Sequence, residues 1–167
     1  MLRRAGLLAR LVVGGVWLWA GLLKIADPAA SVTAVRGYQL LPASAAEVVG
    51  RVLPTVEVAL GAMLLLGLFH RVSGLASALL QLAFVAGIAS VWARGIAIDC
   101  GCFGDGGPDP DAFSQYPWEI ARDVGLLLAS LLVVRARRTP LSLDQLLTPA
   151  PPDHQSQEDR RRVEEVS

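Results

Sequence analysis

Four apolar stretches, separated by short polar segments, dominate the sequence. They cover residues 7–26, 52–69, 72–92 and 118–134. A helix needs roughly 20 predominantly apolar residues to cross the hydrocarbon core of a bilayer, and these stretches are close to that length. The pattern therefore predicts an all-α fold, an integral membrane four-helix bundle with up-down connectivity.

Proline and short polar turns mark the ends of the predicted helices. Asp27-Pro28 ends the first helix, because proline disfavours the helical conformation in the residue before it. Pro54 falls in the first turn of the second helix, where a missing N–H is tolerated. Small and apolar residues alternate between 29 and 50 and predict a short interfacial helix. His70-Arg71 makes a very short turn, so we expect the second and third helices to be antiparallel neighbours.

The fourth stretch opens at Pro117-Trp118 and is cleanly apolar only over residues 124–134. Charged residues occupy its first turns, namely Glu119, Arg122 and Asp123. This helix can span a bilayer if those side chains face other helices or the headgroup layer.

The first apolar stretch has a competing interpretation as a cleaved signal peptide. Arg3 and Arg4 precede it, and small residues follow it at 29–31. Its apolar region is longer than that of a usual signal peptide, and no clear cleavage site follows at once. We therefore expect a retained helix within a transmembrane domain of residues 1–138. Residues 139–167 lose the apolar periodicity and are predicted to form a disordered cytoplasmic tail.

Composition places this domain in a lipid bilayer. Of 167 residues, 53% are apolar, and the mean hydropathy is +0.49. These values are too high for an ordinary soluble domain of this length. Fifteen basic residues balance fifteen acidic ones, so no basic field points to nucleic acid as a partner.

The two cysteines of the chain lie together in a loop at residues 98–104 (IDCGCFG). Cys100 and Cys102 are separated by one residue, and a disulfide between them would close a small, strained ring that is easily reduced. Gly101 and Gly104 supply the backbone freedom that so short a loop needs. The competing interpretations are two unrelated thiols or an inert structural bridge. A bridge across one residue adds little stability through chain entropy, so we favour a redox role for the pair as candidate catalytic residues.

Basic residues predict the orientation, because cytoplasmic loops are enriched in lysine and arginine. One side of the bundle collects Arg3, Arg4, Arg71, Arg135, Arg137 and Arg138. The other side has Arg36, Arg51 and Arg94. The bias predicts a multi-pass protein of the plasma membrane with both termini cytoplasmic. The cysteine loop then lies on the extracytoplasmic, oxidising side, where a thiol pair can cycle through a disulfide.

A polar layer is expected at the same end of the bundle as the cysteines. In an up-down bundle, the helix ends that carry Lys24, Glu57, Arg122 and Asp123 meet at the level of Asp99. Charges inside spanning helices are costly and are usually paired or functional, and Lys24 is expected to pair with Glu57. The alternative is that Lys24 snorkels while Glu57 sits among headgroups. Arg94, Lys24 or Arg122 would favour a thiolate, whereas Asp99 opposes it.

Metal chemistry is disfavoured. Two cysteines are too few for a structural zinc site, His70 lies on the opposite face, and His154 is in the tail. The acidic tract at residues 105–111 lacks the spacing and length of a calcium loop.

Several separate motifs make the chain similar to a known family. They are residues 14–24 (GGVWLWAGLLK), 38–42 (YQLLP), 53–54 (LP) with Glu57 and Gly61, 92–95 (WARG) and 99–104 (DCGCFG). In this order and spacing they resemble the methylamine-utilisation protein MauE family, within the broader DoxX-like membrane proteins, over about the first 135 residues. The most specific part is the cysteine motif, in which Asp99, Gly101, Phe103 and Gly104 surround the two thiols.

The resemblance implies a four-helix membrane protein linked to redox chemistry or to disulfide formation in extracytoplasmic proteins. In the methylamine setting, that means maturation of the disulfide-rich small subunit of methylamine dehydrogenase. DoxX-like relatives imply quinone-linked electron transfer, although no quinone site is visible in the sequence.

Three functions therefore compete. The first is a thiol-disulfide oxidoreductase that acts on a client or a thioredoxin-like partner through Cys100 and Cys102. The second is a non-catalytic assembly or docking factor for such a partner, in which the loop only shapes the surface. The third is a small transporter, for which the sequence offers neither repeats nor broken helices.

Overall fold

The computed structural model describes residues 2–101 and 106–136, and within them every regular element is helical. The elements are α1 (Leu2–Ala26), α2 (Pro28–Gly37), α3 (Ala43–Leu66), α4 (His70–Ala93) and α5 (Ala112–Arg135). The predicted tail at 139–167 lies outside the described residues. The all-α prediction is confirmed for the described part of the chain.

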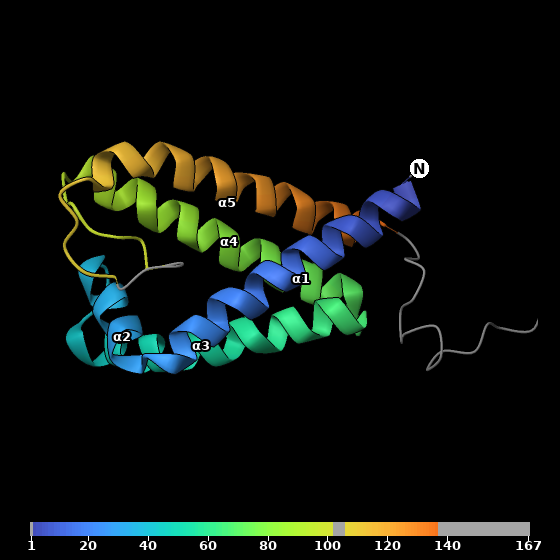
Figure 1. Cartoon of the computed structure of the whole chain (residues 1–167), viewed down its shortest axis with the longest axis horizontal. Coiled ribbons are helices and arrows are strands. Elements are labelled where there is room, and N and C mark those ends of the chain that lie inside the picture. The colour runs from blue at the N-terminus through green and yellow to red at the C-terminus, as the bar shows by residue number, and fades with distance from the viewer. Residues whose placement is uncertain (1, 102–105, 137–167) are drawn as a thin grey trace, which may run out of the picture.

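The long helices are arranged as two pairs. α1 packs along α3, and α4 packs along α5, with α1 also crossing α5 (Figure 1). α3 and α4 touch over a smaller surface, although only residues 67–69 connect them. Figure 1 shows these two helices diverging from that turn. They are therefore sequential but not principal neighbours, and the short turn predicted at His70-Arg71 belongs to the first turn of α4.

Glycines allow the backbones of α1 and α3 to approach closely. A Cβ atom added at Gly61 would lie 2.7 Å from the Leu18 nitrogen and 2.8 Å from the Gly14 oxygen. One added at Gly21 would lie 2.9 Å from the Pro54 oxygen. Small residues with this effect are typical of helix pairs in membranes, where packing must replace the hydrophobic driving force.

α3 begins at Ala43, earlier than the predicted start at residue 52, because alanine-rich residues 43–51 favour helix. Pro54 therefore stands in the helix interior. A proline there cannot donate to the carbonyl four residues before it, which is that of Gly50. The Ser31 hydroxyl of α2 donates to this carbonyl instead, over 2.7 Å. Pro54 thus leaves the Gly50 carbonyl of α3 free to accept a hydrogen bond from α2, and this bond attaches α2 to α3.

α2 is the short helix expected between the first two long ones. The Asp27 carboxylate caps it by accepting from the Ala30 N–H at 3.0 Å, and Pro28 occupies its first turn. α1 ends at Ala26, as Asp27-Pro28 predicts. α2 lies at the end of the bundle opposite the N-terminus (Figure 1).

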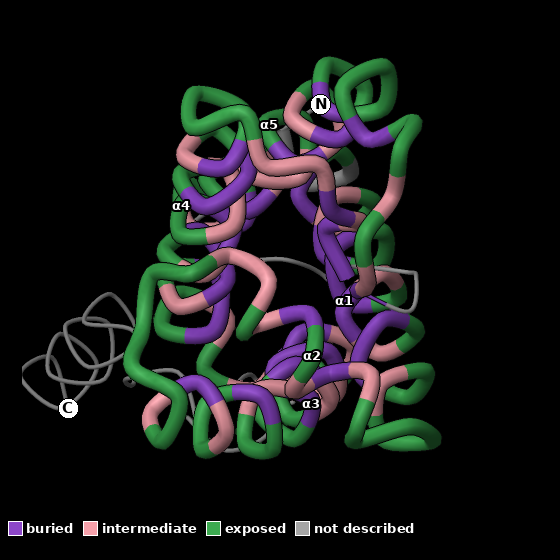
Figure 2. Tube along the Cα trace, turned by 90° about the vertical axis from the view of Figure 1, so that its left-hand side faces the viewer, coloured by how far each residue is buried: buried purple, intermediate pink, exposed green. Residues whose placement is uncertain are grey.

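Within residues 2–101 and 106–136, three helices are long and apolar enough to cross a membrane by length and composition: α1 over residues 5–26, α3 and α4. α5 begins at Ala112, not at 118, and Pro117 lies inside it. The buried residues line the inner faces of the helices (Figure 2). Large apolar side chains such as Trp19, Leu79 and Leu128 are exposed on the outer faces, as lipid contact requires. The chain is thus a helical membrane protein, and a fourth spanning helix stays a prediction.

Candidate functional site

The cysteine loop between α4 and α5 folds back as a narrow hairpin. The Asp99 N–H donates to the Gly107 carbonyl at 2.9 Å, and the Asp109 N–H donates to the Ala97 carbonyl at 3.2 Å. An isolated antiparallel bridge joins Ile98 to Pro108. Cys102, Phe103 and Gly104 lie outside the described residues, so the geometry of the site is that of Cys100 and its surroundings.

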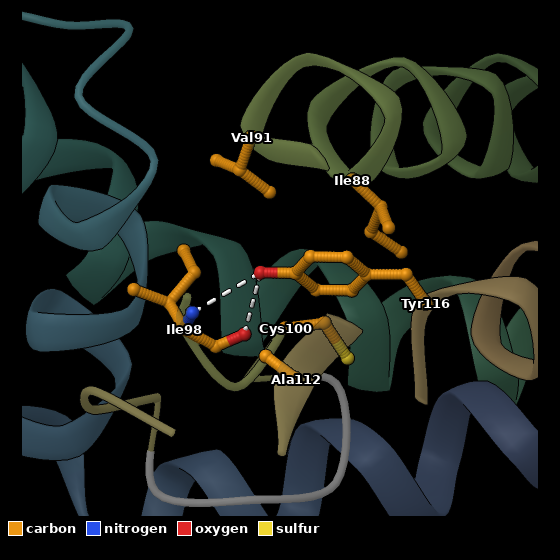
Figure 3. Close-up of a cluster of buried hydrophobic side chains, with 6 residues drawn as sticks. All are labelled: Ile88, Val91, Ile98, Cys100, Ala112 and Tyr116. Carbon is orange, nitrogen blue, oxygen red and sulfur yellow. Dashed lines mark hydrogen bonds between the residues drawn. The ribbon is translucent and has the colours of Figure 1, made fainter. Parts of the chain in front are cut away.

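Two tyrosines hold the hairpin against the helices. The Tyr116 hydroxyl of α5 accepts from the Ile98 N–H at 3.1 Å and lies 3.0 Å from the Ile98 carbonyl, to which it can donate (Figure 3). The same hydroxyl also lies 2.8 Å from the Ile96 carbonyl. The Tyr38 hydroxyl donates to the Cys100 carbonyl at 2.8 Å. Because both tyrosines bond to backbone atoms, they fix the path of the loop without depending on which side chains the loop carries.

Two glycines let the loop rest directly on α2. Gly101 and Gly106 have φ angles of 67° and 68°, in the left-handed region that favours glycine. A Cβ atom added at either would lie 2.4 Å or 2.2 Å, respectively, from the Cβ of Ala34. Gly101 was predicted to supply backbone freedom. It is also required for steric reasons, because Ala34 leaves no room for a side chain at this position.

Cys100 is buried, with 7% of its surface exposed, in an apolar cluster at the wide end of the bundle. Figure 3 shows its neighbours in this cluster, namely Ile88, Val91, Ile98, Ala112 and Tyr116. Its thiol hydrogen-bonds to the Glu119 carboxylate. Glu119 itself is 8% exposed, so this contact is largely shielded from water.

A pocket of about 380 Å³ lies beside the thiol. Its walls are formed by the loop and the first turns of α5, through Asp99, Cys100, Ser114, Gln115, Trp118, Glu119 and Arg122. We call this the cysteine pocket. Its volume falls within the range of about 300 to 1,000 Å³ that small ligand sites occupy.

The charges of the cysteine pocket are two carboxylates and one guanidinium. Asp99 is oriented by the Gly101 N–H, which donates to its Oδ1 atom at 2.7 Å. Asp99 and Glu119 both oppose a thiolate at Cys100, whereas Arg122 favours one. Of the three cations that were expected to favour a thiolate, only Arg122 lines the cysteine pocket. Neither Lys24 nor Arg94 does.

Arg94 has a different task from the one expected. Its guanidinium donates to the Tyr38 carbonyl and, through Nε, to the Ser90 carbonyl at 3.2 Å. These bonds tie the end of α4 to the end of α2. Arg94 therefore supports Tyr38, which in turn holds the Cys100 carbonyl.

A second, smaller cavity lies between the two helix pairs. It measures about 20 Å³ and is lined by Val16, Trp17, Ala20, Lys24, Glu57, Gln81, Phe84, Arg122, Asp123 and Leu126. We call this the inner chamber. Arg122 borders both cavities, so the single polar layer predicted from the sequence is two adjacent sites.

The expected pair of Lys24 and Glu57 is present in the inner chamber. Lys24 Nζ lies 2.6 Å from Glu57 Oε1, with the side chains 10% and 0% exposed. Because α3 starts earlier than predicted, Glu57 lies in mid-helix rather than near an end. Lys24 Nζ also lies 5.4 Å from the centroid of the Phe84 ring, a distance at which the ring attracts a cation. On the other side of the chamber, within α5, Arg122 Nε lies 3.0 Å from Asp123 Oδ1.

Hydrogen bonds between uncharged side chains extend from the inner chamber toward the end of the bundle opposite the cysteine loop. Trp17 Nε1 donates to the Ser77 hydroxyl at 2.6 Å, and that hydroxyl lies 3.0 Å from the Ser130 hydroxyl. These bonds link α1, α4 and α5. Gln81 of α4 lies in the wall of the inner chamber.

Glu119, Tyr116 and Ser77 were missed as site residues by the sequence analysis. Glu119 was visible only as a charge at the start of a helix, and nothing in its spacing connects it to Cys100. Over residues 2–101 and 106–136, no group of three or more histidine, cysteine, aspartate or glutamate side chains is placed to hold a metal ion.

The fold and the site define a class: a membrane protein, helical throughout its described residues, in which two tyrosines hold the segment around Cys100 at one end of the helices. The family profile described as methylamine utilisation protein MauE matches residues 2–136. The chain belongs to this family, which confirms the resemblance drawn from the sequence, and it is a membrane protein related to methylamine utilisation. Comparison with curated proteins and with solved structures gave no match.

The buried ion pair generates the first prediction. Lys24→Met leaves the Glu57 carboxylate buried without its cation, which should cost about 3 to 5 kcal/mol. The double variant Lys24→Met/Glu57→Gln should be less damaged than Lys24→Met alone. Thermal unfolding of the detergent-purified single and double variants measures the coupling. Additive effects of the two substitutions would show that the residues do not interact.

The contact between the loop and α2 generates the second prediction. Gly101→Ala should destabilise the loop through both backbone strain, at about 1 to 2 kcal/mol, and the clash with Ala34. Gly95→Ala is the matched control, because Gly95 has a φ angle of 69° but no atom within 4 Å of an added Cβ. Hydrogen exchange at the Asp99 and Asp109 amides should accelerate more in Gly101→Ala. Equal acceleration in both variants would remove the steric role of Ala34.

Proposed function

We propose that this protein is a membrane thiol-disulfide redox protein that supports the maturation of extracytoplasmic proteins. The observation that carries the proposal is the hydrogen bond of the Cys100 thiol to Glu119 beside an open pocket. A second cysteine, Cys102, lies two residues away in the sequence. Membership of the MauE family relates this chemistry to methylamine utilisation.

The proposed reaction is an exchange between two dithiol–disulfide pairs. Cys100 and Cys102 form one S–S bond and give up two electrons and two protons. The S–S bond of a partner, a thioredoxin-like or client protein, breaks and takes up the same two electrons and two protons. The reverse direction oxidises the partner, and the relative potentials of the two pairs decide between them.

Glu119 supplies the proton acceptor for the first step. The S–H bond of Cys100 breaks and an O–H bond forms on Glu119, so a neutral thiol and a carboxylate become a thiolate and a carboxylic acid. The total charge beside Asp99 and Arg122 is unchanged by this transfer. The thiolate is the nucleophile that attacks a disulfide sulfur.

The proposed location is the plasma membrane, with both termini cytoplasmic and the cysteine loop outside. The start of α1 and the end of α5 lie at one end of the molecule, and α2 and the hairpin lie at the other (Figure 1). The excess of arginine on the side of the termini supports this orientation. A thiol pair on the outer side meets the oxidising compartment in which disulfides persist.

The burial of Cys100 favours one alternative, a non-catalytic docking factor. A cysteine that is 7% exposed can serve as a small apolar side chain that shapes the loop. The double variant Cys100→Ser/Cys102→Ser separates the two functions. Client maturation that persists at a normal protein level would establish the docking factor.

The direct test of the proposed exchange is to trap its mixed disulfide. Cys100→Ser and Cys102→Ser, expressed separately, each remove one thiol, so the remaining cysteine cannot resolve the bond to a partner. At least one of the two variants should accumulate a reducible adduct in membranes, identified by mass spectrometry. The wild type and the double variant are the controls. Absence of an adduct from both single variants would contradict the redox proposal.

The role of Glu119 predicts an unusual pH profile for Cys100 in the Cys102→Ser background. When a thiol and a carboxylate share one proton, the fraction of the thiolate tautomer is constant between their two ionisations. The alkylation rate of Cys100 should therefore form a plateau across that range. In Glu119→Gln the plateau should vanish, and the rate should rise about tenfold per pH unit below the thiol pKa.

Glu47→Gln is the matched control for this pH profile, because Glu47 is an exposed carboxylate on α3 whose partners are Arg36 and Arg51. It should keep the plateau. A wild-type rate that rises steadily with pH, as in Glu119→Gln, would show that Glu119 does not accept the proton.

A further inference from the structure

The inner chamber holds buried charge that the proposed thiol chemistry does not use. Two ion pairs face each other across it, one from each helix pair of the bundle. Lys24 and Glu57 belong to α1 and α3, and Arg122 and Asp123 belong to α5. The two cations balance the two carboxylates, so the chamber needs no further charge.

The hydrogen bonds of the two carboxylates are incomplete. Glu57 uses Oε1 for Lys24, and Asp123 uses Oδ1 for Arg122. Their second oxygens, Glu57 Oε2 and Asp123 Oδ2, are buried and have no hydrogen-bond partner among the described residues. The side chains are 0% and 4% exposed. A buried carboxylate oxygen without a donor costs free energy, so a donor from outside the chain is expected here.

The size of the chamber and the two buried carboxylates beside it select the donor. A cavity needs about 10 to 15 Å³ of accessible volume to hold one water, and the water needs two to four polar partners. The chamber offers about 20 Å³, and Glu57 and Asp123 are among the residues that line it, one from each helix pair. A water can donate one hydrogen to each of two acceptors, whereas a metal cation would be repelled by Lys24 and Arg122.

We propose that the inner chamber is a hydrated proton-exchange site, in which one water donates hydrogen bonds to Glu57 Oε2 and Asp123 Oδ2. The water supplies the bridge along which a proton passes from one carboxylate to the other. On acidification a proton from solvent forms an O–H bond on one of the two carboxylate oxygens, and this O–H then donates to the water while the water donates to the other carboxylate. In the transfer the first O–H bond breaks, the water takes up that proton and gives one of its own to the second carboxylate, where a new O–H bond forms, and the water is regenerated. The ion pairs hold Oε1 and Oδ1, which leaves the second oxygens to the water.

The site lies next to the cysteine pocket. Arg122 lines both cavities, and Glu119 precedes Asp123 by one turn of α5. Charged groups around the chamber are thus Lys24 from α1, Glu57 from α3, and Glu119, Arg122 and Asp123 from α5, with Asp99 from the loop beyond Arg122. Among these groups, Glu119 is a carboxylate close enough along α5 to exchange a proton with Asp123. The water bridge itself does not depend on the thiol chemistry.

Infrared difference spectroscopy on the protein in lipid nanodiscs tests the proposal, with pH as the variable and Cys100→Ser/Cys102→Ser as the background. We expect an O–H band of a strongly hydrogen-bonded water that shifts in heavy-oxygen water. We also expect a carboxylic acid C=O band that shifts in D₂O. Both bands should be lost in Asp123→Asn and in Glu57→Gln, and both should persist in Glu47→Gln.

The charge-balanced variant Lys24→Met/Glu57→Gln serves if a single substitution prevents folding, and it should lose both bands as well. Bands that persist in all three chamber variants, or the absence of both bands from the parent protein, would overturn the proposal. Because the background lacks both cysteines, a failed thiol exchange leaves this result unchanged. Conversely, a mixed disulfide trapped from a protein without these bands would retain the redox function and reject the chamber.

Discussion

Charge buried between apolar helices is the constraint on which this structure depends. Removing one partner of such a pair is far more costly than removing both, so Lys24 and Glu57 must stay together once they are inside. Their contact at 2.6 Å joins α1 to α3, while Asp123 and Arg122 occupy the facing side on α5. The bundle is therefore built as two close-packed helix pairs with a polar seam between them. Hydrogen bonds from Trp17 through Ser77 to Ser130 extend that seam away from the cysteines.

A series of contacts to backbone atoms connects α3 to α2 and α2 to the cysteine loop, and so fixes the position of the loop on the bundle. Pro54 leaves the Gly50 carbonyl for Ser31, and this bond fastens α2. α2 then presents Ala34 beneath Gly101 and Gly106, and Tyr38 at its end bonds to the Cys100 carbonyl. Tyr116 holds the other side of the hairpin. The thiol is thereby held against Glu119 largely by bonds from the two tyrosines to the backbone of the loop.

Pattern and local chemistry predicted much of this from the sequence. Long apolar stretches gave the helices, Asp27-Pro28 gave the end of α1, and the two opposite charges at Lys24 and Glu57 gave their pairing. Helix starts at Ala43 and Ala112 were missed because a proline was taken as a first-turn residue in both cases. Pairing of α3 with α1 rather than α4 follows from the close approach at Gly14 and Gly61, which is a property of two distant segments. Glu119 could not be assigned to Cys100, since only the folding back of the hairpin places the thiol beside the second turn of α5.

The central claim is that Cys100 is a redox-active thiol and not a small apolar side chain in a loop. Mass-spectrometric mapping of differentially alkylated cysteines, in native membranes equilibrated over a series of redox potentials, tests it most directly. We expect Cys100 to pass from a thiol to a disulfide-bonded state with Cys102 in a single two-electron transition. A Cys100 that is recovered as an unmodified thiol at every potential, including the most oxidising, would contradict it.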